Sequence, residues 1–235
     1  MAKHKHCFSR TVFLLLAMHS LMGTTAVVAE ELLSAVTRQR VHPVVIRNEN
    51  NALLSLTVTC KKPYVLMNAI TVSLAGCDDL RDIESLQFYF SNEKGGMEPT
   101  MAFGERVGAA VKLTVRGHAR LKAGDNIFWL SCRMRRDASL LRKVDAVVTS
   151  VGTNRGAISV TDKTPGIRKR IGLALRRHFD DGVHTYRIPA LATTSEGSLL
   201  CVYDMRRRRR KDLQEDIDIG LLRSTDGGQT WEPQR

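Results

Sequence analysis

The strongest constraint on this chain's fold is an alternation of apolar and polar residues with a period of two, between about residues 40 and 160. Leu54, Leu56 and Val58 alternate with Ser55 and Thr57. The pattern recurs at 70–74, 86–90 and 111–116, and further candidate strands lie at 127–133 and 144–151. Successive side chains of an extended chain point to opposite faces, so each run can bury one face in a core.

Turn-forming residues separate these runs. Segments 92–96 (NEKGG) and 122–126 (KAGDN) combine Gly with Asn or Asp, the residues that tight turns favour. Short strands joined by such turns, with no long helical period, predict an all-β chain with an antiparallel β-sandwich over residues 31–160. The chain has 235 residues, 43% of them hydrophobic, which is enough for a sizeable core.

The first 29 residues have the order of a secretory signal peptide. Lys3, Lys5 and Arg10 precede an apolar stretch at 11–23, and small residues lead up to Ala29. The apolar stretch is shorter than the roughly 20 residues of a membrane-spanning helix. We therefore expect cleavage after residue 29, no membrane span in the mature chain, and export to the periplasm, the outer surface or the extracellular medium.

The chain is basic, with 36 Lys and Arg against 24 Asp and Glu and a net charge of +12. Such an excess of basic residues is typical of proteins that bind nucleic acids. The expected export argues against one, and the basic run 206–211 has no interleaved aromatic residues on which bases could stack. We expect no nucleic-acid partner and interpret the run as a rim that attracts an anionic substrate.

The cysteines allow two interpretations. Cys60, Cys77, Cys132 and Cys201 follow the signal segment and could form two disulfides, with three possible connectivities, or remain buried thiols. None has CxxC or Cys/His spacing, so we expect no metal and no cofactor. The sandwich either binds sugar or packs against a neighbouring domain. Packing is favoured because Trp129 lies in an apolar run and no surface cluster of Trp and Tyr is evident.

A change of composition marks a boundary after the sandwich. Residues 161–175 contain Pro165-Gly166 and several basic residues, and we expect a linker there. The strand pattern then resumes at 186–193, 199–203 and 217–223, which predicts the beginning of a second sheet.

The most specific local pattern ends this region, at residues 224–231 (STDGGQTW). We interpret it as a hairpin turn. In it, the Asp226 carboxylate accepts hydrogen bonds from amides of the turn, the Gly residues adopt positive φ, and Trp231 packs into the core of the sheet. Its structural positions fit S-x-D-x-G-x-T-W: Ser224, Asp226, Gly228, Thr230 and Trp231.

The order of motifs resembles that of secreted bacterial exo-α-sialidases, the neuraminidases with BNR repeats or Asp boxes. Residues 186–189 (YRIP), Arg206 nineteen positions after Arg187, Asp212 and the 224–231 box follow in the family's order. The resemblance is specific from about residue 166 to 235 and looser over 31–160. It implies that 176–235 is about one blade, the start of a six-bladed β-propeller, truncated in this chain.

The resemblance also implies site roles and a partner. Arg187 would bind the carboxylate of sialic acid, Arg206 would face a ring hydroxyl, and Asp212 would protonate the leaving oxygen and then activate water. Asp216 and Asp218 compete with Asp212 for that role. A Tyr nucleophile assisted by Glu gives retention in the family.

Sialylated glycans on glycoproteins, gangliosides and oligosaccharides would be the substrates. Because no Tyr of this chain follows Asp212, the chain alone is expected to be inactive. The alternative is a non-catalytic, secreted sialoglycan-binding protein or adhesin.

Overall fold

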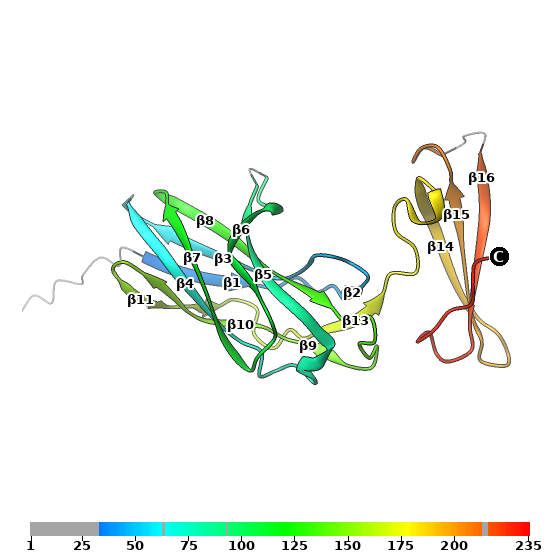
Figure 1. Cartoon of the computed structure of the whole chain (residues 1–235), viewed down its shortest axis with the longest axis horizontal. Coiled ribbons are helices and arrows are strands. Elements are labelled where there is room, and N and C mark those ends of the chain that lie inside the picture. The colour runs from blue at the N-terminus through cyan, green and yellow to red at the C-terminus, as the bar shows by residue number, and fades with distance from the viewer. Residues whose placement is uncertain (1–32, 63, 93, 213–215) are drawn as a thin grey trace, which may run out of the picture. The chain divides into compact units, whose positions relative to one another are not determined.

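The computed structural model describes residues 33–62, 64–92, 94–212 and 216–235 (Figure 1). Within them the chain is all-β, interrupted by two single-turn 3-10 helices, η1 (Leu80–Asp82) and η2 (Asp180–Gly182). In this described part no helix is long and apolar enough to cross a membrane. The predicted signal peptide at 1–29 lies outside the described residues.

Two mainly antiparallel sheets form the predicted sandwich. The six-stranded sheet has the order β12-β1-β3-β8-β5-β6, and the four-stranded sheet has the order β11-β10-β4-β7. The strands of the first sheet are β12 (Thr161–Asp162), β1 (Leu33–Arg38), β3 (Asn51–Cys60), β8 (Gly124–Met134), β5 (Ile83–Ser91) and β6 (Met97–Val107). Those of the second are β11 (Gly156–Ser159), β10 (Val147–Thr153), β4 (Val65–Ser73) and β7 (Lys112–Leu121).

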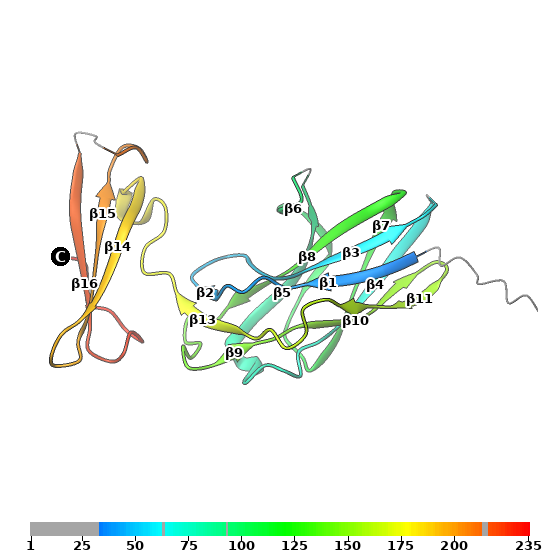
Figure 2. The ribbon, with the colours of Figure 1, turned by 180° about the vertical axis from the view of Figure 1, so that it is seen from behind.

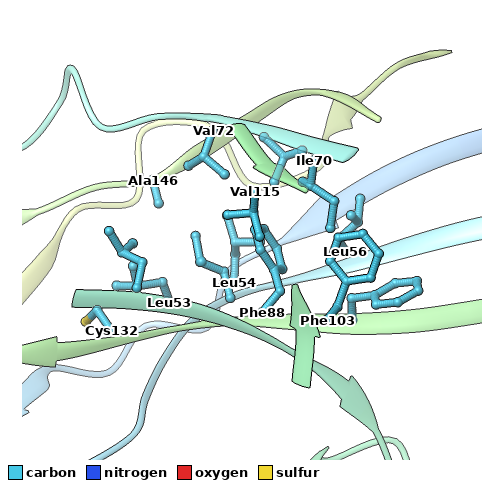
Figure 3. Packing of buried hydrophobic residues seen from close by; sticks show 14 of the residues in the cluster. Leu53, Leu54, Leu56, Ile70, Val72, Phe88, Phe103, Val115, Cys132 and Ala146 are labelled. Atoms are coloured by element: carbon cyan, nitrogen blue, oxygen red, sulfur yellow. The ribbon is translucent and has the colours of Figure 1, made fainter. Parts of the chain in front are cut away.

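The inward-facing residues of the alternating runs make the core of the sandwich. Figure 3 shows Leu54 and Leu56 of β3 beside Phe88 of β5, with Ile70 of β4 and Val115 of β7 facing them. All five side chains are at most 1% exposed. The predicted period of two therefore identified the buried face.

Trp129 differs from the expected core position. Its side chain is half-buried, its Nε1 donates to the Gly95 carbonyl at 3.1 Å, and the Arg40 guanidinium lies 5.9 Å from the ring centre. An indole with one polar edge satisfies its N–H best at the border of a core.

The segment expected to be a linker contains two paired strands. In a small sheet, β13 (Lys169–Leu173) lies between β2 (Val44–Ile46) and β9 (Lys143–Val144), and β12 pairs with β1. The structure thus differs from the expectation of a linker over 161–175. Ile171 of β13 is buried opposite Val44. This arrangement depends on pairing between distant segments, and the five-residue sequence of β13 has no alternating pattern that would predict it.

A separate antiparallel sheet follows, β14 (Thr185–Thr193), β15 (Leu199–Arg206) and β16 (Ile217–Ser224), coloured yellow to red in Figure 2. It has its own small core, made by Val183, Cys201, Tyr203, Met205 and Leu222. The three predicted strand segments are confirmed. The pairing of β15 with both neighbours continues to Arg206, three residues past its predicted end.

The four cysteines that the structure describes are free thiols. Cys60, Cys132 and Cys201 are buried and Cys77 is half-buried. Burial raises the pKa of Cys132 to about 12, which makes this thiol unreactive at neutral pH.

Candidate active site

The register of β14, β15 and β16 brings the predicted site residues to one end of one face. Arg187 of β14 lies opposite Asp204 of β15, and Arg206 follows Asp204 by two residues. Residues two apart on a strand share a face. A bulge after Arg187, where Ile188 has a φ of 51°, ends the regular pairing of β14 beside this arginine.

Arg206 is the buried centre of the site, only 2% exposed. Its Nη2 lies 3.0 Å from Asp204 Oδ2 and 2.5 Å from Asp212 Oδ1, and its Nη1 donates to the Arg210 carbonyl at 2.9 Å. Among the described residues, its Nε is the buried side-chain polar atom without a hydrogen-bond partner. A buried, unsatisfied guanidinium N–H is costly, and an acceptor from a ligand would satisfy it.

Arg187 contacts the same carboxylate from the neighbouring strand. Its Nη1 lies 3.3 Å from Asp212 Oδ1 and 3.2 Å from the Arg210 carbonyl oxygen. The side chains of Arg187 and Asp212 are 42% and 66% exposed, so both are open to solvent. The structure therefore brings together all three predicted site residues, Arg187, Arg206 and Asp212.

The contacts determine the protonation state of Asp212. The hydrogen bond from Arg206, helped by the charges of Arg206 and Arg187, lowers the pKa of the Asp212 carboxyl. Burial by itself would lower the pKa of Arg206, but its hydrogen bonds to Asp204 and Asp212 raise it overall. These contacts favour the ionised form of Asp212, because both guanidinium groups stabilise its negative charge.

The competing acids have other partners. Asp218 Oδ2 lies 2.5 Å from Arg207 Nη2, and Asp216 Oδ2 lies 3.3 Å from Arg208 Nε. Arg207 and Arg208 of the basic run therefore form ion pairs with Asp218 and Asp216, the two other acids that the sequence offered for the role of Asp212.

Sequence reasoning missed Asp204 and the Arg210 carbonyl. The period of two along β15 is a signal that could have found Asp204, because it places Asp204 on the face of Arg206. Nothing in the sequence predicts the Arg210 carbonyl, whose position depends on the path of the loop.

The 224–231 turn has the predicted structural role. Ser224 Oγ donates to Asp226 Oδ1 at 2.8 Å, and Thr230 N donates to the Asp226 carboxylate at 3.0 Å. The Trp231 indole donates to the Gly228 carbonyl and packs against the small core, and Gly227 and Gly228 have φ of 73° and 91°. The hydrogen bonds from Thr230 and Ser224 lower the pKa of Asp226 to about 2.

Comparison with known proteins finds relatives that are named sialidases. A sialidase of Bacteroides fragilis (strain YCH46) is 32% identical over 225 residues, covering 82% of this chain and 40% of that protein. A sialidase of Paraclostridium sordellii is 45% identical over 47 residues, 20% of this chain and 11% of that protein. The solved structure of Hadza microbial sialidase Hz136 superposes with a TM-score of 0.73 at 30% identity, covering 85% of this chain and 43% of that one.

The chain thus spans less than half the length of the Bacteroides and Hadza relatives. Residues 33–157, more than half of the chain, match the family described as the N-terminal domain of BNR-repeat neuraminidase. The sandwich, the motif order and these matches agree, and the chain belongs to the BNR-repeat neuraminidase family.

Proposed function

We propose that this chain contributes to an exo-α-sialidase, which releases terminal α-linked sialic acid from glycoconjugates. The observation that carries the proposal is the arginine pair that already holds a carboxylate: Arg187 and Arg206 both contact Asp212 Oδ1. Sialic acid differs from most sugars by a carboxylate on its anomeric carbon. A guanidinium has planar paired donors that match such a group, so Arg187 would bind the substrate carboxylate while Arg206 would face a ring hydroxyl.

In the proposed reaction the substrate carboxylate takes the place of Asp212 beside Arg187. Asp212, freed and protonated, gives its proton to the glycosidic oxygen as the bond from that oxygen to the anomeric carbon breaks. The anomeric carbon bonds to a nucleophilic oxygen, in the family that of a Tyr, whose hydroxyl proton passes to the assisting Glu and returns when the Tyr is displaced. Water then attacks the anomeric carbon, passes a proton to Asp212 and displaces the nucleophile, which gives net retention.

The nucleophile is not one of the described residues of the C-terminal sheet. Tyr186 donates its hydroxyl proton to the Asp180 carbonyl at 2.7 Å, and the Tyr203 hydroxyl donates to Gln234 Oε1 at 2.8 Å. Burial raises the pKa of both hydroxyls, opposite to what a nucleophilic phenol needs. We infer that the Tyr and its Glu come from propeller blades that this chain does not supply.

A non-catalytic sialoglycan-binding protein is the second candidate. The low pKa of Asp212 favours it, because an ion-paired carboxylate orders the arginines without donating a proton. Under both candidates the partner is a sialylated glycan, and export by the predicted signal peptide would bring the protein to such substrates.

Turnover of a fluorogenic α-sialoside by the complete enzyme tests the proposal. We expect Asp212→Asn to lower kcat by about 10²-fold or more, because the acid is lost. The matched control is Asp218→Asn, which removes an acid paired with Arg207 and should leave kcat unchanged. Sialoglycan binding without turnover by the unaltered enzyme, or equal turnover by Asp212→Asn, would favour the binding protein.

A further inference from the structure

One end of the sandwich presents exposed apolar side chains among cations. There β4 begins, β7 ends and β10 turns into β11 (Figure 1). Leu66 of β4 lies opposite Arg120 of β7. On its other side, Leu66 N donates to Asn154 Oδ1 at 3.0 Å, and Asn154 N donates to the Leu66 carbonyl at 2.9 Å. The exposed residues at this end are called the end patch: Tyr64, Leu66, Arg120, Lys122 and Arg155.

The apolar part of the end patch is held out of the core. Val65 is buried, 2% exposed, whereas Tyr64 and Leu66 on either side of it are 72% and 44% exposed. Tyr64 also has a φ of 73°, in the left-handed region that costs a non-glycine residue energy. Strained conformations persist most often at binding and active sites, and Tyr64 is exposed as a binding residue would be.

The charge around these two side chains is positive. The three segments that meet here, 61–68, 114–123 and 151–158, contain no Asp or Glu. They contain six cations: Lys61, Lys62, Arg116, Arg120, Lys122 and Arg155. Arg120, Lys122 and Arg155 form no ion pair with any residue that the structure describes. The acid in the next turn, Asp125, accepts the Thr59 hydroxyl at 2.6 Å.

This combination matches the surface of an anionic bilayer. Exposed Lys and Arg are attracted to anionic lipid headgroups. Tyr is favoured at the level of the headgroups, and an apolar side chain gains by reaching the acyl boundary. A soluble polyanion such as a nucleic acid would use the cations, but it would leave Leu66 in water.

We infer that the end patch docks this protein on the surface of an anionic phospholipid bilayer, without crossing it. Arg120, Lys122 and Arg155 contact lipid phosphates, Tyr64 lies among the headgroups, and Leu66 reaches the first acyl carbons. This inference goes beyond the proposed function and does not rest on it, since the end patch contains none of Arg187, Arg206 and Asp212.

Cosedimentation with lipid vesicles tests the inference. The exported chain, starting at residue 30, is used so that the apolar stretch at 11–23 cannot itself bind lipid. We expect binding to phosphatidylcholine vesicles containing about one third phosphatidylglycerol to be at least about tenfold stronger than binding to phosphatidylcholine alone. This binding should weaken as the salt concentration rises.

The first pair of variants tests the cations. Arg120→Gln with Lys122→Gln should weaken binding to the anionic vesicles by about tenfold or more. The matched control is Arg135→Gln with Arg136→Gln, which removes two exposed charges just after the other end of β8. This control should bind like the unaltered chain, because its charges lie outside the end patch.

The second pair of variants tests the apolar contact. Tyr64→Ser with Leu66→Thr should weaken binding by about tenfold, because two side chains no longer enter the interface. The matched control is Val41→Thr with Leu141→Thr, at side chains that are 89% and 88% exposed outside the end patch. Circular dichroism should show that all four double variants are folded.

Equal binding to both kinds of vesicle, equal loss in a patch variant and its control, or no binding would overturn the inference. A loss in the cation variant without a loss in the apolar variant would also overturn it, and would indicate a soluble polyanion. Turnover of a soluble sialoside by the complete enzyme decides the proposed function separately, and it should be the same in all four double variants.

Discussion

At the scale of single residues, the site depends on how two arginines share one carboxylate. Arg206 is buried and held by Asp204, so its position is determined before a ligand binds. Arg187 is more exposed, and its contact with Asp212 at 3.3 Å is longer than that of Arg206 at 2.5 Å. In the proposed reaction, Arg187 is therefore the arginine that would exchange Asp212 for a substrate carboxylate at the lower cost.

We expect Arg187→Lys to lower kcat/KM of the complete enzyme by about 10²-fold, because an ammonium cannot make the paired hydrogen bonds of a guanidinium. Steady-state kinetics with a fluorogenic sialoside measures the effect. Arg223→Lys, on β16 of the same sheet, is the matched control and should stay close to the unaltered enzyme. A value for Arg187→Lys within twofold of the unaltered enzyme would contradict the assigned role.

At the scale of elements, the 224–231 turn stabilises the end of β16. Asp226 has a pKa of about 2 against an ordinary 3.8, because Thr230 and Ser224 donate to its carboxylate. A carboxyl whose pKa is lower in the folded state stabilises the fold above its unfolded pKa, and this contribution disappears as the pH falls through the folded pKa. The stabilisation by Asp226 is therefore full above about pH 4 and is lost towards pH 2.

We expect Asp226→Asn to lower the melting temperature at pH 7, and to lower it much less at pH 2, where the unaltered carboxyl is itself becoming protonated. Thermal unfolding of this chain with the substitution Trp129→Phe, followed by the fluorescence of the remaining Trp231, provides the measurement. Glu196→Gln, in the turn between β14 and β15, is the control for loss of one acid. An equal drop at both pH values would show that the charge of Asp226 is not what stabilises the turn.

At the scale of the whole molecule, the chain combines an N-terminal sandwich with a second sheet that carries the candidate site. The Bacteroides and Hadza relatives are more than twice as long as the parts that match it. In the proposed reaction, the described C-terminal sheet would supply the acid and two arginines but no activated nucleophile, and an acid without a nucleophile cannot complete a retaining cleavage.

We therefore expect this 235-residue chain to release no sialic acid by itself. A fluorogenic sialoside incubated with the purified chain provides the test, and its Asp212→Asn variant defines the background. Release above that background would mean that the nucleophile lies within the chain and that the site is misplaced.

The sequence alone determined the features that depend on local chemistry. Period-two alternation identified the buried faces of strands such as β3, because side-chain direction alternates along any extended chain. The 224–231 turn was predictable for the same reason, since its hydrogen bonds join residues at most four apart. The motif order also indicated Arg187, Arg206 and Asp212, although not that one carboxylate would lie between the two arginines.

Only the tertiary structure decided what depends on pairing between distant segments. The place of β13 beside β2 and the alignment of Asp204 with Arg187 both require strands to meet in a particular register. Such register is a property of the folded chain, because contributions from many residues select it together. The ion pairs that lower the pKa of Asp212 follow from that register, and composition does not predict them.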